Sequence, residues 1–185
     1  MRITARWQGF KTPGCINGLQ VGLILPTGAF HQTFRSGPAK GGEVDRGLQP
    51  GTGTVQAVVG YYLFGKLSKD FDYIVQAQGQ AALNSRDLYR PGASGQIAAA
   101  LHYTHWRAIT PQLELNLRAS AKDSGLNSDR ENSGGEQLFA APGVIVKLSR
   151  SMSAYTYIQV PIYERVNGFQ LTPHYTATVG VQFRL

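Results

Sequence analysis

The sequence predicts an all-β protein, an antiparallel up-and-down transmembrane β-barrel. Three observations carry this prediction. Residues 111–122, PQLELNLRASAK, alternate apolar and polar side chains, so a strand there has one apolar and one polar face. The alternation recurs in further segments, most of them of about 11–13 residues, longer than the usual strand of about five or six and sufficient for the 9–11 of a tilted membrane strand. The connections are alternately short and long, as in outer-membrane barrels.

The predicted strands follow one another along the whole chain. In order they are 2–10, 18–25, 53–65, 72–84, 96–106, 111–122, 137–148, 154–164 and 174–185. Within 154–164 the alternation is less regular: Ile158, Val160 and Ile162 face away from Tyr155, Tyr157, Gln159 and Tyr163. We therefore expect eight to nine strands and a single domain over residues 1–185.

The connections sort into two kinds. Short ones are predicted at 68–70, 107–110 and 150–152, and long, polar or glycine-rich ones at 26–52, 85–94, 123–136 and 165–173. Counting back from a periplasmic C-terminus, every long loop falls on the extracellular side. A soluble up-and-down barrel has no reason to sort its loops in this way.

Composition excludes several other classes. Charged residues make up 16% of the chain, against roughly 25% in soluble domains. No apolar run approaches the ~20 residues that a membrane helix needs. The net charge of +7 is scattered, so we expect no nucleic-acid partner. The single cysteine, Cys15, excludes an internal disulfide framework.

The beginning of the chain raises a further expectation. Segment 2–10 makes a ninth strand, whereas single-chain bacterial barrels have an even number. The first residues, MRITARWQGFKTPG, contain no apolar core of a secretory signal. We therefore expect an N-terminally incomplete chain, the C-terminal part of a larger even-stranded barrel. The alternative is that 2–10 is an extended lead-in and that eight strands close alone.

Four stretches carry a resemblance to a known family. They are GLQVGLILPTGAF at 18–30, LQPGTGTVQAVVGYY at 48–62, NSRDLYRPG at 84–92 and VPIYERVNGFQLTP at 160–173. The first two resemble strands of the phenol-degradation meta-pathway (MetA-like) family of outer-membrane proteins, and the last two resemble loop and hairpin segments of related proteins. The resemblance implies an outer-membrane barrel and a passive route for small compounds, hydrophobic or aromatic ones among them. Two positions depart from the expected pattern: Ile24 stands where the family has Lys, and Leu185 replaces the Phe usual in barrel assembly signals.

The polar strand faces supply the candidate lumen residues. They are Gln76, Gln78, Gln80, His102, Glu114, Asn116, Arg118, Gln182 and Arg184. Such residues either brace the barrel through a hydrogen-bonded network or form a polar constriction that tunes permeation. Glu114 and Arg118 share a face but lie about 13 Å apart along the strand. We therefore expect each to pair with a neighbouring strand.

We expect no metal, no cofactor and no catalysis. His102 and His105 point to opposite faces of a strand, and no further ligand stands at metal-binding spacing. His174 opens the last predicted strand at the extracellular rim, where Asp123 and Ser124 could approach it. No spacing of nucleophile and base supports a hydrolase there.

The leading expectation is a porin-like transport protein of the Gram-negative envelope, located in the bacterial outer membrane. Its partners would be outer-membrane lipid, against Leu113, Leu115 and Leu117, and the barrel assembly machinery, through the C-terminal strand. The sequence names no permeant. Three alternatives stay open: a soluble lipocalin-like binder of an apolar ligand, a barrel enzyme using His174, and a structural barrel without a pore.

Overall fold

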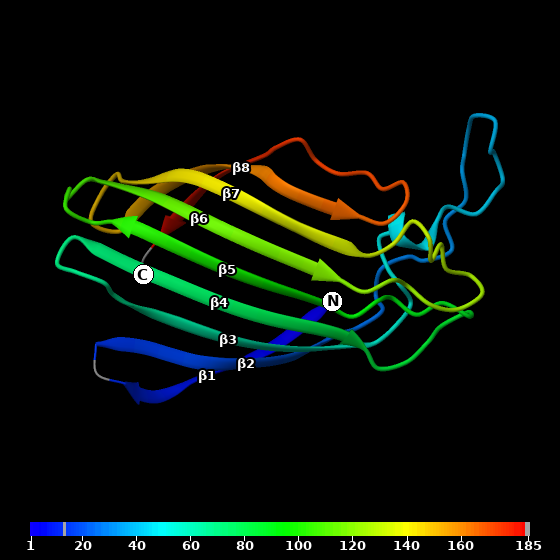
Figure 1. Cartoon of the computed structure of the whole chain (residues 1–185), viewed down its shortest axis with the longest axis horizontal. Coiled ribbons are helices and arrows are strands. Elements are labelled where there is room, and N and C mark those ends of the chain that lie inside the picture. The colour runs from blue at the N-terminus through cyan, green and yellow to red at the C-terminus, as the bar shows by residue number, and fades with distance from the viewer. Residues whose placement is uncertain (13, 184–185) are drawn as a thin grey trace.

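The computed structural model describes residues 1–12 and 14–183, and within them it is almost entirely β-structure (Figure 1). The strands are β1 (Arg2–Thr12), β2 (Cys15–Ile24), β3 (Gln56–Lys66), β4 (Phe71–Ala82), β5 (Ser94–Tyr103), β6 (Ile109–Ser120), β7 (Gly135–Lys147), β8 (Met152–Val166) and β9 (Thr176–Phe183). One short 3-10 helix, η1 (Arg46–Leu48), lies in a loop. Among these residues, no helix is long and apolar enough to cross a bilayer.

The nine strands form one sheet in the order of the sequence. Every strand pairs antiparallel with its neighbour, from β1–β2 to β8–β9. The predicted up-and-down order is therefore confirmed. The first strand is a full member of the sheet, with Arg2 opposite Ile24 and Trp7 opposite Leu19. The alternative reading of this segment as an unpaired lead-in is wrong.

The sheet is open, so a barrel closed by eight strands alone, the alternative prediction from the sequence, is not observed. Within the described part of the chain, β1 and β9 are its two edges and do not pair with each other. In an up-and-down sheet all odd-numbered strands run in the same direction, so β1 and β9 are parallel. A fully antiparallel closure between these edges would need an odd number of additional strands.

The sheet is strongly curved, with its polar face on the concave side. The Arg2 guanidinium on β1 donates a hydrogen bond to Gln78 on β4, although β2 and β3 lie between them. Side chains can bridge two intervening strands in this way only across a concave surface. The buried apolar residues of the strands, Val58, Ala82, Phe139 and Ala141, have the same orientation.

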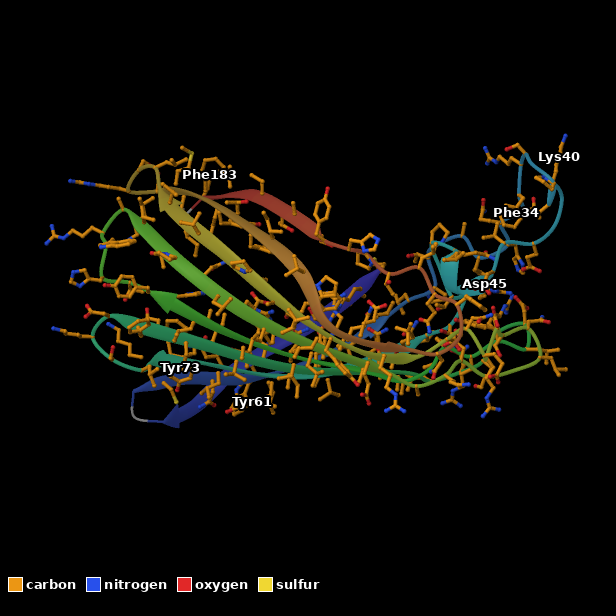
Figure 2. The ribbon with its side chains drawn as sticks, turned by 45° about the horizontal axis from the view of Figure 1, so that its top comes forward. Phe34, Lys40, Asp45, Tyr61, Tyr73 and Phe183 are labelled. Carbon is orange, nitrogen blue, oxygen red and sulfur yellow. The ribbon has the colours of Figure 1, made fainter. Side chains whose placement is uncertain are left out.

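The connections have the predicted alternation. Long loops at 25–55, 83–93, 121–134 and 167–175 meet at one end of the sheet, and tight turns at 67–70, 104–108 and 148–151 lie at the other (Figure 1). The longest loop carries Phe34 and Lys40 on an arm that projects beyond the sheet (Figure 2). The ends of that arm are held by a bridge between Thr33 and Glu43.

A β-bulge in β8 corrects one predicted face. Phe139 on β7 pairs with Pro161, whereas its neighbour Leu138 pairs with Tyr163, so Ile162 is an extra residue. Such an insertion shifts the following side chains to the opposite face. Tyr163 therefore lies on the apolar face with Leu138, not with Tyr155 and Tyr157 as the alternation predicted.

Candidate functional site: a polar belt on the concave face

One register row of polar side chains crosses eight strands. From β1 to β8, the row passes through Arg6, Gln20, Gly60, Gln78, Gln96, Arg118, Gln137 and Glu164. We call its seven side chains, all but Gly60, the polar belt. Directly opposed residues of antiparallel strands have Cβ atoms about 4.5–5.5 Å apart. Neighbouring belt side chains are therefore close enough to interact.

Hydrogen bonds tie the belt together at both ends. On the β1 side, Arg6 Nε donates to Gln20 Oε1 at 2.8 Å. On the β8 side, Gln137 Nε2 lies 3.5 Å from Glu164 Oε2. Gln78, in the middle of the row, accepts the bond from Arg2 described above. These contacts orient the amides across the concave face.

Both belt arginines lie against aromatic rings of the adjacent row toward the tight turns. The Arg6 guanidinium is 5.7 Å from the centre of the Tyr62 ring, and that of Arg118 is 5.4 Å from the centre of the Phe139 ring. Cation–π contact stabilises this placement. Phe139 is only 2% exposed, so packing holds its ring in place against the Arg118 guanidinium. Within the described residues, neither arginine lies within ion-pair distance of a carboxylate.

A cavity of about 270 Å³ adjoins the centre of the belt. Its polar lining comes from β4–β7 and one loop: Gln78, Gln80, Ser94, Gln96, Arg118, Ser120, Gln137 and Gln170. Among the described residues that line it, Arg118 is the only charged one. The cavity is slightly smaller than typical ligand pockets of about 300–1,000 Å³, so it suits a small molecule or ion.

The predicted lumen residues do not all gather at this site. Gln78 and Arg118 belong to the belt, and Gln80 lines the cavity from the adjacent row. Gln80 Nε2 donates to Gln56 Oε1 at 2.7 Å, which joins β4 to β3. These three residues are the part of the predicted set that the structure brings together.

The other predicted residues lie along the same face at different heights. Gln76 and Asn116 stand one row nearer the tight turns, Glu114 two rows nearer, and His102 further still, opposite Asp72 and Gln112. Gln182 lies on β9 and pairs with Ser153 of β8, away from the cavity. Arg184 lies outside the described residues.

The cross-strand pairing expected for Glu114 and Arg118 is not seen as an ion pair among the described residues. Glu114 stands between Ala100 and Ala141 in the register. Arg118 contacts the Phe139 ring instead of a carboxylate. Both side chains face the concave side as predicted, but neither forms an ion pair with a neighbouring strand among the described residues.

Four belt members were missed as candidates: Arg6, Gln20, Gln137 and Glu164. A fifth, Gln96, was likewise absent from the candidate set. The belt runs across strands, whereas alternation describes one strand at a time. Its members are recognisable from sequence only once the register between successive strands is known.

The long loops above the cavity are joined through Asp123. Its two carboxylate oxygens accept bonds of 2.7 Å from Tyr89 Oη and Gly92 N, and its own N–H donates to Ser133 Oγ at 3.0 Å. Burial, the hydrogen bond to Asp123 and its negative charge raise the pKa of Tyr89 above its usual range. No hydrogen bond or ion pair joins His174 to Asp123 in the part of the chain that the structure describes.

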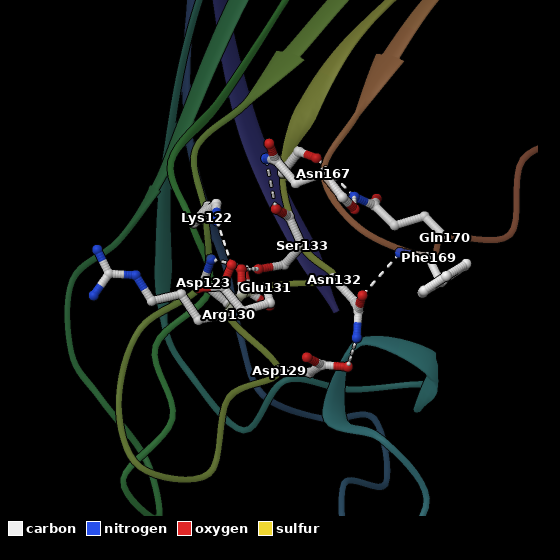
Figure 3. A network of polar contacts seen from close by, with 11 residues as sticks. Lys122, Asp123, Asp129, Arg130, Glu131, Asn132, Ser133, Asn167, Phe169 and Gln170 are labelled. Atoms are coloured by element: carbon white, nitrogen blue, oxygen red, sulfur yellow. Dashed lines mark hydrogen bonds and ion pairs between the residues drawn. The ribbon is translucent and has the colours of Figure 1, made fainter.

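Asn132 connects the same loops to the segment after β8 (Figure 3). Its Oδ1 accepts from Phe169 N at 2.8 Å, and its Nδ2 donates to Asp129 Oδ2 at 2.8 Å. Gln170 Nε2 donates to Gly134 O at 2.7 Å. These bonds hold the cavity-lining Gln170 beside the ends of β6 and β7.

Among residues 1–12 and 14–183, no group of three or more His, Cys, Asp or Glu residues could hold a metal ion. Comparison with protein-family models gives no match, and comparison with curated proteins gives none. The resemblance in the sequence therefore stays a prediction.

Proposed function

We propose that this chain forms the wall of a bacterial outer-membrane β-barrel that passively admits small compounds. The observation that carries the proposal is the orientation of the two sheet faces. The apolar side chains lie on the convex face, and none of the described segments covers them. The polar belt lies on the concave face, where the water-filled interior of such a barrel would be.

The exposure of the apolar face is extensive. Leu113, Leu115 and Leu117 are 50%, 44% and 41% exposed. Large apolar side chains of neighbouring strands continue this surface: Ile3, Trp7, Leu19, Val21, Leu23, Val59, Tyr61, Ile97, Leu101, Ile158, Val179, Val181 and Phe183. Contiguous apolar surfaces of this kind mark sites of contact with a membrane or a protein. Outer-membrane lipid is the partner we propose for it.

Strand length and aromatic placement support the same environment. The strands have 8–15 residues, and a tilted membrane strand needs about 9–11. Phe71, Tyr103 and Trp106 cluster at the tight-turn end. The ring centre of Tyr103 lies 5.1 Å from that of Phe71 and 5.4 Å from that of Trp106. Aromatic side chains at the ends of the strands are typical of the interfacial girdles of membrane barrels.

The open edges support a larger barrel. Because β1 and β9 run in the same direction, additional strands of odd number would restore antiparallel pairing throughout and give an even total. We propose that such strands complete the wall in the membrane. The β9 edge, at the C-terminal end of the sheet, is the segment that we propose the assembly machinery recognises.

The concave face suits small compounds with polar and aromatic parts. Beside the belt it carries Tyr62 and Phe139, and nearer the turns Tyr155 and Tyr157, whose ring centres lie 6.5 Å apart. A passage lined in this way is in keeping with the compounds implied by the MetA-like resemblance. We propose transport without catalysis.

Two measurements test the proposal. The native protein should remain with outer membranes after extraction with alkaline carbonate, and the purified protein should open steady conductances in planar lipid bilayers. A soluble protein that carries an apolar ligand would overturn the proposal in favour of a lipocalin-like binder. A membrane protein that is electrically silent and gives no solute flux would indicate a structural barrel.

A further inference from the structure

We infer that the polar belt selects anions and that its centre, at Arg118, binds small carboxylates. The inference rests on the proposed function and adds the charge class of the permeant. The sequence prediction included Arg118 only as a general lumen residue, with no preference for either sign of charge.

The belt is positively charged. It contains two arginines, one glutamate and four neutral glutamines. The glutamate, Glu164, stands at the far end of the row, beside Gln137. Arg2 adds a third guanidinium where it reaches Gln78. Rings of arginine or lysine are a means by which pores select anions.

The charge of Arg118 is available to a ligand. Its side chain is exposed, and its guanidinium lies against the Phe139 ring without a carboxylate in ion-pair distance among the described residues. A guanidinium supported by an aromatic ring still presents N–H donors along its edge. That planar edge matches the two oxygens of a carboxylate.

The surroundings of Arg118 complete such a site. Gln96 and Gln137 flank it directly in the register, so amide N–H donors lie on both sides. The residues that the structure describes around the adjoining cavity of about 270 Å³ include no acidic side chain. The nearest acidic residue on the same strand is Glu114, four positions away and outside that lining. An anion at Arg118 therefore meets donors and positive charge, whereas a cation there meets no carboxylate in the described cavity lining.

The test is ion selectivity of the purified protein in planar bilayers under a potassium chloride gradient. The wild type should have a reversal potential of the sign that indicates anion preference, and acetate added to one side should reduce the chloride current. In Arg118→Gln, the ratio of chloride to potassium permeability should fall about fivefold, as expected when one unit charge about 8 Å from the ion path in water no longer attracts chloride and repels potassium. The acetate effect should be lost.

Two further variants keep the inference falsifiable. Arg150→Gln removes the same charge in the tight turn 148–151, away from the belt, and should leave selectivity unchanged. Gln96→Glu places a carboxylate beside Arg118 and should reduce anion preference independently of Arg118→Gln. A conducting protein without anion preference, or one whose selectivity survives both belt substitutions, would overturn the inference and leave the proposed function standing. Absence of conductance and solute flux would overturn both.

Discussion

Substitution of Leu115 by arginine should destabilise the protein in a bilayer, whereas the same residue at Asn116 should be tolerated. Leu115 lies in the middle of β6, 44% exposed on the apolar face, between Ala99 and Ala140. Neither neighbour can pair with a guanidinium. Asn116 is the next residue and faces the concave side, beside the polar belt.

The expected magnitude follows from the position of Leu115 near the centre of the strand. An arginine on the lipid face at the bilayer midplane costs about 2–4 kcal/mol, which lowers the folding equilibrium constant roughly 30- to 1,000-fold. Arg at position 116 stays in an aqueous environment, so its effect should be within about 0.5 kcal/mol.

Urea titration in phospholipid vesicles, followed by tryptophan fluorescence, measures both effects on the free energy of unfolding. Leu115→Ala serves as the control, because it shortens the side chain without adding charge. If Asn116→Arg is the strongly destabilised variant and Leu115→Arg is tolerated, the assignment of the two faces is inverted and the proposed function fails.

Two further predictions concern a pair of glycines and the loops. A Cβ at Gly79 would meet nothing within 4 Å, so Gly79→Ala should stabilise the protein by about 0.5–1 kcal/mol. A Cβ at Gly18 would lie 2.2 Å from Trp7 O, so Gly18→Ala should cost about 1–3 kcal/mol. Equal urea midpoints for the two variants would contradict this difference. Tyr89→Phe should cost about 1.5–3 kcal/mol and expose the long loops to protease. Because the folded state raises the pKa of Tyr89 above its ordinary 10.0, the stability of the wild type should decline as pH rises beyond 10.0. Thermal unfolding measures this decline, which should be smaller in Tyr89→Phe. An equal decline in stability in the variant would refute the contribution of Tyr89.

The strands could be predicted because their signal is local. Leu113, Leu115 and Leu117 alternate with polar residues over a strand that the structure places at Ile109–Ser120. Each such segment reveals its own period without knowledge of its neighbours. The order of short and long connections was equally accessible, because it depends only on the lengths between segments.

The polar belt could not be predicted in the same way. Gln20, Gln96 and Gln137 are widely separated in the chain and align only because the pairing register brings them into one row. A shift of one residue in any strand pair would send its partner to the opposite face. The sequence therefore identified Gln78 and Arg118 separately but not the row that joins them.

The β8 bulge shows a second limit. Tyr163 was placed with Tyr155 and Tyr157 because strict alternation assumes that no residue is inserted. The extra residue Ile162 reverses that assignment. The residues around this bulge have no reliable sequence signature. The irregular alternation of apolar and polar residues in 154–164 was the one sign of the bulge in the sequence.

The orientation of one strand in a bilayer tests the central claim most directly. Cys15 is the only cysteine, so in a Cys15→Ser background a nitroxide label can be attached through Leu115→Cys or Asn116→Cys. In vesicles, we predict that the label at 115 collides mainly with oxygen dissolved in lipid and the label at 116 mainly with a water-soluble nickel chelate. A label at 115 that responds to the nickel chelate, or to neither reagent, would contradict a lipid-facing apolar surface.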